Sequence, residues 1–465
     1  MDWAAQELAR ADLGDKRLEV RAIKLLKSLG EKSTETIPVA CQGWAETKAA
    51  YRFFDNAKVS AEKVLAPHIE ATLERMAGQK TMLLVQDTTQ LNYSMQHLKK
   101  DIGPIIHKNY RGILLHPTIA VTTEGVCLGV VDSYHWYRSP NHEKTRRQKN
   151  SDNLRTPIEE KESYRWLKGY KKADVIAHSL PECQIVSIAD READIYDIYY
   201  EAHQESCKAK WLIRSIKNRP LVDDSGHKTN EKLWDKVRKE PISDFCEFKL
   251  PARKGKPARL VKQSIRAKTL WLHPPTGRRG KLRCQPVLIN ALIASEIDTP
   301  KGEKPIEWLL LTNLAIETSE DRLAILRYYL CRWQIEIFFK ILKSGCRVEQ
   351  LQLNCAKRYS PCLALYLIIA WRIFYLTLLS RTQADMSCEL FFHATEWQVA
   401  YRVKLKKKPP QKPPSLATMM QLVARLGGFL NRKSDKHPGP KPIWLGLQRL
   451  ADLLLAATSL QHTYG

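Results

Sequence analysis

The stretch QIVSIADREADIYD, residues 184–197, joins an apolar run to a cluster of acidic side chains. Its apolar and β-branched first part predicts a buried strand over 184–190, and a helix is expected from Glu192. Asp190 then stands where the strand ends, and functional groups gather at that edge of an α/β sheet. An aspartate that caps a helix N-terminus gives the same pattern, so this stretch alone leaves both interpretations open.

A second aspartate occupies the same kind of position. The run MLLVQ at 82–86 predicts a strand, and Asp87 follows it directly at the start of DTT. The order β-β-β-α-β-α-β is typical of an α/β sheet with helices on its faces, so both aspartates are expected at the carboxyl edge of one sheet. The other expected elements are strands over 113–121 and 126–136, a helix over 159–180 and a strand over 209–216.

Paired carboxylates at strand ends suit phosphoryl transfer. Cleavage of a phosphodiester needs an activated nucleophile and neutralisation of charge on the reacting oxygens, which two Mg²⁺ ions about 3.5–4 Å apart provide. Carboxylate oxygens are ligands that Mg²⁺ prefers. Asp87 and Asp190 therefore predict part of a magnesium site.

A third carboxylate belongs to a helical region expected from about residue 320. Tyr329, Arg332, Glu336 and Lys343 are spaced three, four and seven residues apart. At about 100° per residue they fall within an arc of about 60° of one continuous helix, with apolar residues on the other side. A carboxylate between cations and a phenol suits a metal ligand surrounded by phosphate contacts. Surface ion pairing, worth about 0.3 kcal/mol, gives the same stripe.

The composition favours a polyanion as the partner. The chain has 465 residues, with 75 Lys and Arg against 50 Asp and Glu, so its net charge is +25. Such an excess is typical of nucleic-acid-binding proteins. Because 44% of the residues are apolar, the composition indicates a folded protein and excludes a basic disordered tail.

Several features favour the cytoplasm. The eleven cysteines are odd in number, and their spacing indicates neither a disulfide framework nor a zinc finger. The first residues have no secretory signal pattern. The apolar stretch 362–379 has the length of a membrane span, but Arg372 in its middle favours a buried helix.

The patterns divide the chain into five segments. In the first, Leu18, Ala22, Leu25, Leu26 and Leu29 form an apolar stripe opposite basic side chains, which indicates a DNA-binding face or a merely solubilising one. The run KLKKKPPQKPP at 404–414 predicts an exposed linker. The expected segments are an N-terminal helical module (1–70), a first α/β part (71–217), a strongly basic β-rich insertion (218–318), a second α/β part (319–383) and a C-terminal helical region (384–465).

The three carboxylate blocks resemble those of a known enzyme family. LLVQDTT around Asp87, ADREADIYD around Asp190, and Y-x2-R-x3-E-x6-K from Tyr329 to Lys343 are similar to the catalytic blocks of the DDE transposases of the insertion-sequence-four family, most of all its transposon-five type. The resemblance covers essentially the whole chain. It extends into LGDKR (13–17), AYRFFDN and VSAE (within 50–62), PKGEKPIEWLLLT (300–312) and ARLGGF (424–429).

The resemblance implies a fold and a set of roles. It implies a ribonuclease-H-like catalytic domain interrupted by an all-β insertion, an N-terminal DNA-binding domain and a C-terminal dimerisation region. Two divalent ions, Mg²⁺ with Mn²⁺ as a substitute, would be held by Asp87, Asp190 and Glu336. Tyr329, Arg332, Lys343 and Arg214 would bind DNA phosphates, and Trp308 and Trp333 would stack on an unpaired or flipped base. Trp308 lies in the apolar run WLLLT, so a place in the core is its alternative.

The function that the resemblance implies is cut-and-paste transposition by a cytoplasmic, nucleoid-associated protein. A homodimer in a synaptic complex would bind double-stranded transposon ends, cleave them by metal-dependent phosphoryl transfer through a hairpin, and join the 3′ ends to target DNA. Two alternatives remain. One is a ribonuclease-H-like nuclease that cuts without strand transfer, and the other is a non-catalytic DNA-binding regulator derived from a transposase.

Overall fold

The computed structural model describes residues 2–95, 102–105, 110–139, 156–250, 257–275, 284–432 and 434–464. They form two compact units, each assembled from separate stretches of the chain. The first unit comprises Met1–Gly78, Thr88–His142 and Gln334–Gly465, and the second comprises Gln79–Asp87 and Glu143–Trp333. Many basic residues of the expected insertion, at 251–256 and 276–283, lie outside the described residues.

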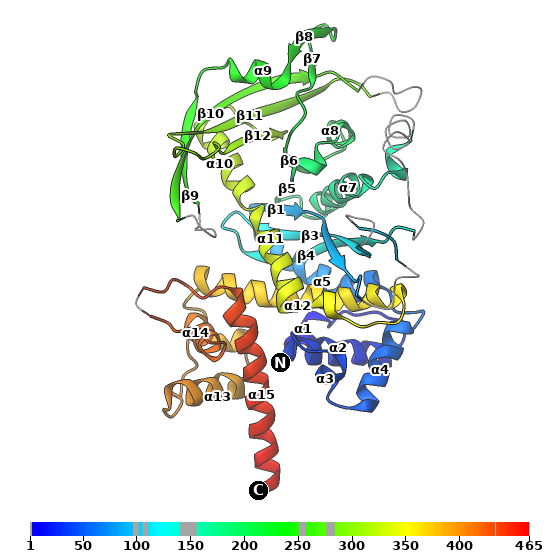
Figure 1. Ribbon diagram of the computed structural model, residues 1–465, viewed down its shortest axis with the longest axis vertical. Coiled ribbons are helices and arrows are strands. Elements are labelled where there is room, and N and C mark those ends of the chain that lie inside the picture. The colour runs from blue at the N-terminus through cyan, green and yellow to red at the C-terminus, as the bar shows by residue number, and fades with distance from the viewer. Residues whose placement is uncertain are drawn as a thin grey trace. The chain divides into compact units, whose positions relative to one another are not determined.

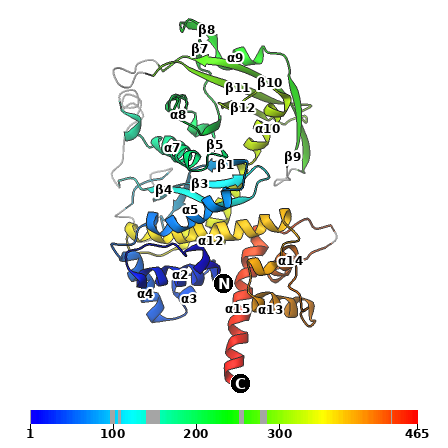
Figure 2. The same ribbon diagram turned by 180° about the vertical axis from the view of Figure 1, so that it is seen from behind.

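The first unit is mainly helical and is built around α12 (Ala356–Thr382). N-terminal helices pack along one part of α12 and C-terminal helices along another (Figures 1 and 2). The N-terminal helices are α1 (Trp3–Glu7), α2 (Lys16–Glu31), α3 (Ile37–Cys41), α4 (Trp44–Asp55) and α5 (Ala61–Met76). The C-terminal helices are α13 (Ala394–Leu405), α14 (Leu416–Leu426) and α15 (Pro440–Tyr464).

Helix α12 confirms the buried helix expected at 362–379. It is long and apolar enough to cross a membrane by length and composition, and 83% of its most apolar stretch is buried inside the protein. Arg372, the charge in its middle, lies 4.5 Å from the ring centre of Trp3 and also faces the ring of Phe392. Aromatic faces therefore surround a guanidinium that a purely apolar core would exclude.

The predicted stripe of the N-terminal module is largely confirmed. Ala22, Leu25, Leu26 and Leu29 are buried on α2, while Leu18 is half-buried. The helix begins after Asp15, whose carboxylate accepts a hydrogen bond from the Arg17 backbone N–H. This N-cap explains the aspartate in LGDKR, because it satisfies one of the backbone N–H donors left open at a helix start.

An antiparallel group of three strands completes the first unit. It consists of β2 (Thr89–Asn92), β3 (Gly112–Thr122) and β4 (Cys127–Trp136), which confirms the two strands expected here. A buried cluster holds it to the helices. His68 on α5 approaches Glu7 on α1 through Nδ1 (2.5 Å), and its Nε2 accepts a hydrogen bond from the Val130 backbone N–H on β4 (2.9 Å). The pair is closed by Arg75, which donates to Glu7.

The second unit contains a mixed sheet. Strands β1, β5 and β6 are parallel, and the strands that follow are antiparallel, in the order β1-β5-β6-β12-β11-β10-β7-β8 with β9 paired to β10. The strands are β1 (Thr81–Gln86), β5 (Gln184–Ala189), β6 (Lys210–Arg214), β7 (Pro220–Val222), β8 (Lys228–Lys232), β9 (Asp244–Leu250), β10 (Arg259–Leu272), β11 (Val287–Ile297) and β12 (Glu307–Thr312). The helices are α7 (Tyr164–Ser179), α8 (Tyr196–Ala202), α9 (Leu233–Arg238) and α10 (Ser319–Leu330).

Two expectations for the second unit need correction. Residues 218–318 are not purely β, because α9 interrupts the strands and buries Leu233, Trp234 and Val237. These strands also extend the main sheet, since β12 pairs directly with β6. The helix expected from Glu192 is a 3₁₀ turn at Arg191–Ala193 followed by α8.

Candidate active site

Asp87 and Asp190 stand level with each other at the ends of two neighbouring parallel strands. Thr81 pairs with Gln184 and Val85 with Ile188, a constant offset of 103 residues (184 − 81), and Asp190 follows Asp87 by the same 103 (190 − 87). Continuing this register places the two aspartates opposite each other. Because side chains alternate along a strand, both then project from the same face of the sheet.

The two carboxylates differ in their present partners. One oxygen of Asp190 accepts a hydrogen bond from the Glu192 backbone N–H (2.8 Å), so the N-cap role weighed from the sequence is real, in a 3₁₀ turn. Asp87 lies 3.2 Å from an Arg332 guanidinium nitrogen. Both side chains of that ion pair are mostly buried, so it is only weakly screened by solvent.

Tyr329 and Arg214 join the same cluster. Tyr329 is only 3% exposed. Burial raises the pKa of its phenol, against the opposing pull of the Arg332 and Arg214 charges, while the charge of Asp190 adds to the rise. Arg214 ends β6 and donates to the Glu307 backbone oxygen on β12 (3.2 Å). The second unit thus brings together two aspartates, two arginines and one tyrosine.

The single helical stripe expected from Tyr329 to Lys343 is wrong. Helix α10 ends at Leu330, α11 (Trp333–Lys340) starts after two intervening residues, and Ile341–Gly345 form a π-helical turn. The Arg332 backbone N–H bonds to the Tyr329 oxygen, a tighter i to i−3 link that breaks the 3.6-residue period. Tyr329 and Arg332 are consequently buried, whereas Glu336 is exposed.

Glu336 and Lys343 belong to the first unit. Glu336 lies on α11, four residues after Arg332 in the chain. Lys343, in the π-helical turn, donates to the Gln90 backbone oxygen (2.5 Å) and lies 3.8 Å from Glu349.

The two tryptophans have different surroundings. Trp308 is 7% exposed, with its ring stacked on Phe248 (centroids 5.0 Å apart, planes at 19°) and edge-on to Tyr329 (5.5 Å). Trp333 is 43% exposed, and the Arg332 guanidinium lies 5.2 Å from its ring centre.

A buried hydrogen bond that the sequence did not suggest ties the two aspartate strands together. Gln86, directly before Asp87, donates to the Ser187 hydroxyl on β5 (2.9 Å). Gly169 on α7 makes room for it, because a β-carbon there would lie 2.2 Å from the Gln86 side-chain oxygen. In the sequence, the only sign of this hydrogen bond is an amide side chain at the end of an otherwise apolar strand.

A second unexpected network surrounds Asp194. This carboxylate, 1% exposed, accepts hydrogen bonds from the Tyr199 and Ser215 hydroxyls and from the backbone N–H groups of Ile216 and Lys217. It also pairs with Arg219. Burial opposes its ionisation, but Arg219 and these donors outweigh burial, so its pKa is lowered. The network fixes the chain directly after Arg214.

The donor chemistry of the cluster fits a hard divalent cation. Two carboxylates side by side at strand ends are oxygen ligands of the kind that Mg²⁺ and Mn²⁺ prefer. Among the described residues, no three His, Cys, Asp or Glu side chains come together closely enough to hold a metal ion. If a cation binds here, Asp87 and Asp190 would need at least one further ligand from elsewhere.

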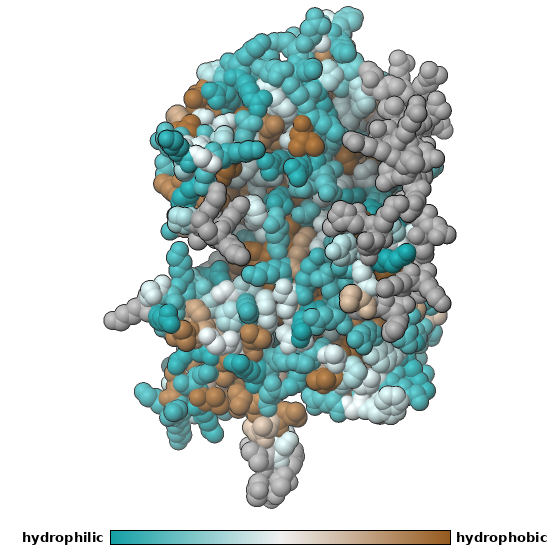
Figure 3. Space-filling view, viewed as in Figure 1, coloured by the Kyte–Doolittle hydropathy of each residue, from teal (hydrophilic) through white to brown (hydrophobic). Residues whose placement is uncertain are grey.

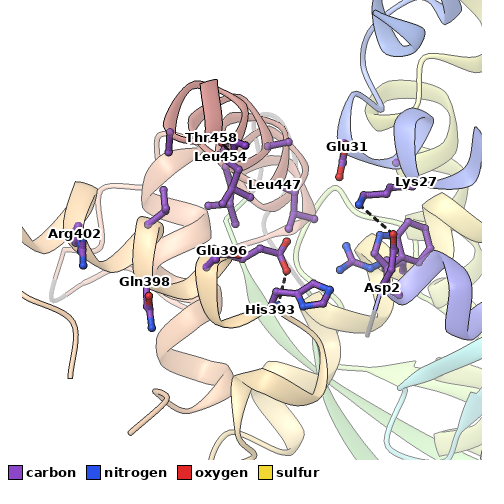
Figure 4. A pocket seen from close by; sticks show the side chains of 18 residues that line it. Asp2, Lys27, Glu31, His393, Glu396, Gln398, Arg402, Leu447, Leu454 and Thr458 are labelled. Atoms are coloured by element: carbon purple, nitrogen blue, oxygen red, sulfur yellow. Dashed lines mark hydrogen bonds and ion pairs between the residues drawn. The ribbon is translucent and has the colours of Figure 1, made fainter. Parts of the chain in front are cut away.

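A separate cavity of about 470 Å³ lies in the first unit, between helices α1, α2, α12, α13 and α15 (Figure 4). Charged groups line one side, where Lys27 pairs with Asp2 (3.1 Å) and Glu396 accepts from the His393 backbone N–H, and leucines of α15 line another. None of the candidate site residues lines this cavity.

Three family models match successive parts of the chain. They are a transposase DNA-binding domain over residues 1–59, a transposase DDE domain over 170–359 and the Tn5 transposase dimerisation domain over 368–464. The chain belongs to the DDE transposase family. In this transposase the DDE match includes Asp190 and Glu336, whereas Asp87 precedes it.

A solved structure is also similar to this transposase. It is a piggyBac transposase synaptic complex with hairpin DNA, matched with a TM-score of 0.37 and 9% sequence identity. The match covers 87% of this chain and 58% of that chain, so this transposase spans less than two thirds of the solved protein.

Proposed function

We propose that this protein is a cut-and-paste transposase that cleaves transposon ends by metal-dependent phosphoryl transfer and joins the freed 3′ ends to target DNA. The observation that carries the proposal is the register of β1 and β5, which sets Asp87 level with Asp190 beside Arg332, Tyr329 and Arg214. Carboxylates with cations around them match the needs of a reaction that builds negative charge on phosphate oxygens.

In this proposal Asp87, Asp190 and Glu336 hold two Mg²⁺ ions, with Mn²⁺ as a substitute. When bound, the ions activate the attacking oxygen and stabilise the leaving one. Arg332 now neutralises Asp87, so its guanidinium can turn to a DNA phosphate once a cation takes over that role. Arg214, Tyr329 and Lys343 bind further phosphates, and Trp308 and Trp333 stack on an unpaired base.

The domain roles follow the same proposal. We assign DNA-end binding to residues 1–70 and dimerisation to 384–465. The α/β parts at 71–217 and 319–383 form the ribonuclease-H-like catalytic domain, with 218–318 inserted into it. Two copies would act together on two ends in a synaptic complex, by way of a hairpin, in the nucleoid of the cytoplasm. The three family matches and the +25 charge support these roles.

The test compares single variants on DNA from the inverted repeats that flank the gene. Asp87→Ala, Asp190→Ala and Glu336→Ala should each abolish cleavage in Mg²⁺ while end binding stays within a few-fold, because these residues hold metal and not the duplex. Arg165→Ala serves as a control, since Arg165 pairs with Glu192 near Asp190 but is given no ligand role. A variant that keeps more than a tenth of the parental cleavage rate removes its residue from the metal site.

The same assay separates the alternatives. Cleavage without joining of 3′ ends would indicate a nuclease, and end binding without any Mg²⁺-dependent or Mn²⁺-dependent cleavage would indicate a DNA-binding regulator. The proposal requires both cleavage and joining.

A further inference from the structure

The Trp308 ring is covered by a residue that no motif or family match assigns. Phe248 on β9 stacks nearly parallel on the indole of Trp308 on β12, with ring centroids 5.0 Å apart. In the sheet order, β9 and β12 are separated by β10 and β11. The sheet therefore curls until its edge strand faces β12, as the path of β9 beside α10 in Figure 1 shows.

The stack occupies the surface that a DNA base would need. Aromatic side chains bind unpaired bases by offering a flat face, whatever the base. Trp308 is 7% exposed, with Phe248 against its face and Tyr329 against its edge. A base can stack on Trp308 only after one of these neighbours moves.

Phe248 is the neighbour that can move. Tyr329 is 3% exposed and sits inside α10, whereas Phe248 is half-buried on a strand in which every second residue is exposed. The strand itself is anchored, since Asp244 at its start pairs with Arg322 on α10. Rotation of one partly exposed side chain is fast and requires no backbone shift.

We propose that Phe248 is a displaceable cover that takes the place of an unpaired DNA base on Trp308 until that base arrives. The proposal rests on the proposed function, in which Trp308 is a base-stacking residue next to the phosphate-binding cluster. An aromatic pair and a base stacked on an aromatic ring are both held by face-to-face contact of flat apolar surfaces, so a base brought to the site by the bound DNA can take the place of the Phe248 ring. Phe248 thereby raises the threshold for base capture and keeps the apolar face dry in the absence of DNA.

The matched control lies on the same strand. Phe245 is three residues from Phe248, projects from the opposite face of β9 and is 54% exposed, with Lys262 over its ring. Figure 3 shows apolar and hydrophilic atoms mixed over this edge of the sheet. Phe245→Ala removes the same number of atoms from β9 without uncovering Trp308.

The experiment uses the full-length protein and a DNA hairpin, with its stem from the flanking inverted repeat and one unpaired 2-aminopurine at its tip. Quenching of 2-aminopurine reports stacking, and a fully paired duplex of the same sequence is the reference. Phe248→Ala and Phe248→Leu should tighten binding of the unpaired-base DNA relative to the duplex by about three- to tenfold and deepen the quenching. Phe248→Trp should do the opposite, and Phe245→Ala should leave the ratio unchanged.

Two outcomes overturn the proposal. If Phe248→Ala, Phe248→Leu and Phe248→Trp all weaken binding and lower the melting temperature, Phe248 is a structural residue. If the ratio does not respond to any of them, no base exchanges with Phe248. Duplex-end binding and Mg²⁺-dependent cleavage by the parental protein are measured in parallel, so their absence counts against the proposed function, and their presence isolates the failure to Phe248.

Discussion

The Asp194 side chain holds the segment after β6 in its conformation. Its carboxylate accepts from two hydroxyls and two backbone N–H groups and pairs with the buried Arg219. Asp194→Asn keeps the shape but leaves Arg219 without its charge partner, so we expect a loss of about 3–5 kcal/mol of unfolding free energy. Urea denaturation measures it. An exposed aspartate gives the comparison, because Asp224→Asn should cost less than about 0.5 kcal/mol.

Trp308 is buried in the absence of DNA, which favours the core alternative for this state. Trp308→Ala removes a ring packed between Phe248 and Tyr329 and should cost about 3–5 kcal/mol of stability, lowering cleavage and hairpin formation together at elevated temperature. Trp308→Phe keeps an aromatic face and should fold nearly normally. The melting temperatures, with nick and hairpin rates measured well below them, check both. An alanine variant as stable as the parent would contradict the burial argument.

Single residues also show what the sequence could and could not reveal. The placement of Asp87 and Asp190 at strand ends followed from the apolar runs before them. Their spacing of 103 residues matches the strand register, yet only the pairing of β1 with β5 gives that spacing a meaning. Gln86, Asp194 and Phe248 were missed because each acts through a partner far away in the chain, and local periodicity carries no signal of such contacts.

Among the elements, strands were predicted better than helix ends. The runs over 82–86, 113–121 and 126–136 were apolar enough to identify β1, β3 and β4. The break between α10 and α11 was not predictable, because a 3₁₀ link and a π-helical turn leave the pattern of apolar residues almost unchanged. Two motifs of the resemblance outside the carboxylates contain structural devices, the Asp15 N-cap in LGDKR and a close backbone approach in ARLGGF. In ARLGGF, for example, a β-carbon at Gly427 would lie 1.8 Å from the Pro442 oxygen at the start of α15.

The junction of α1, α5 and β4 should make stability depend on pH. Burial lowers the pKa of His68, and its Nε2 must stay unprotonated to accept from Val130. Burial opposes ionisation of Glu7, but the hydrogen bond from His68 and the charge of Arg75 outweigh it and lower that pKa too. Below the ordinary His68 pKa of 6.5 the unfolded chain binds a proton that the folded chain does not.

We therefore expect stability to be level above about pH 6.5 and to fall as the pH drops below it. For this one group the free energy of unfolding falls by up to about 1.4 kcal/mol per pH unit, and the melting temperature falls with it. His68→Gln can still donate to Glu7 and accept from Val130 but does not titrate, so its pH profile should be flatter. Burial also lowers the pKa of His135, which is present in both the parental protein and the variant. His135 should therefore leave a smaller pH dependence of the melting temperature in both. Superimposable profiles would rule out His68 as a source of the dependence.

For the whole molecule, the charge of +25 should govern affinity for DNA. Each phosphate that a Lys or Arg neutralises releases counterions and contributes about −0.9 to the slope of log K against log salt. We expect a slope steeper than about −3 for end DNA, measured by anisotropy from 50 to 300 mM KCl, a range chosen to bracket about 0.15 M. A shallower slope would assign the excess charge to solubility.

The position of α12 in the first unit has a consequence for how the chain is made. Helices α2, α4 and α5 pack on α12, yet α5 ends at Met76 and α12 at Thr382, 306 residues later (382 − 76). At about 5–20 residues per second, the ribosome needs roughly 15–60 s to synthesise the chain from the end of α5 to the end of α12. During this time the apolar sides of the first helices stay uncovered on a tethered chain, so we expect the nascent protein to depend on holding chaperones until translation passes α12.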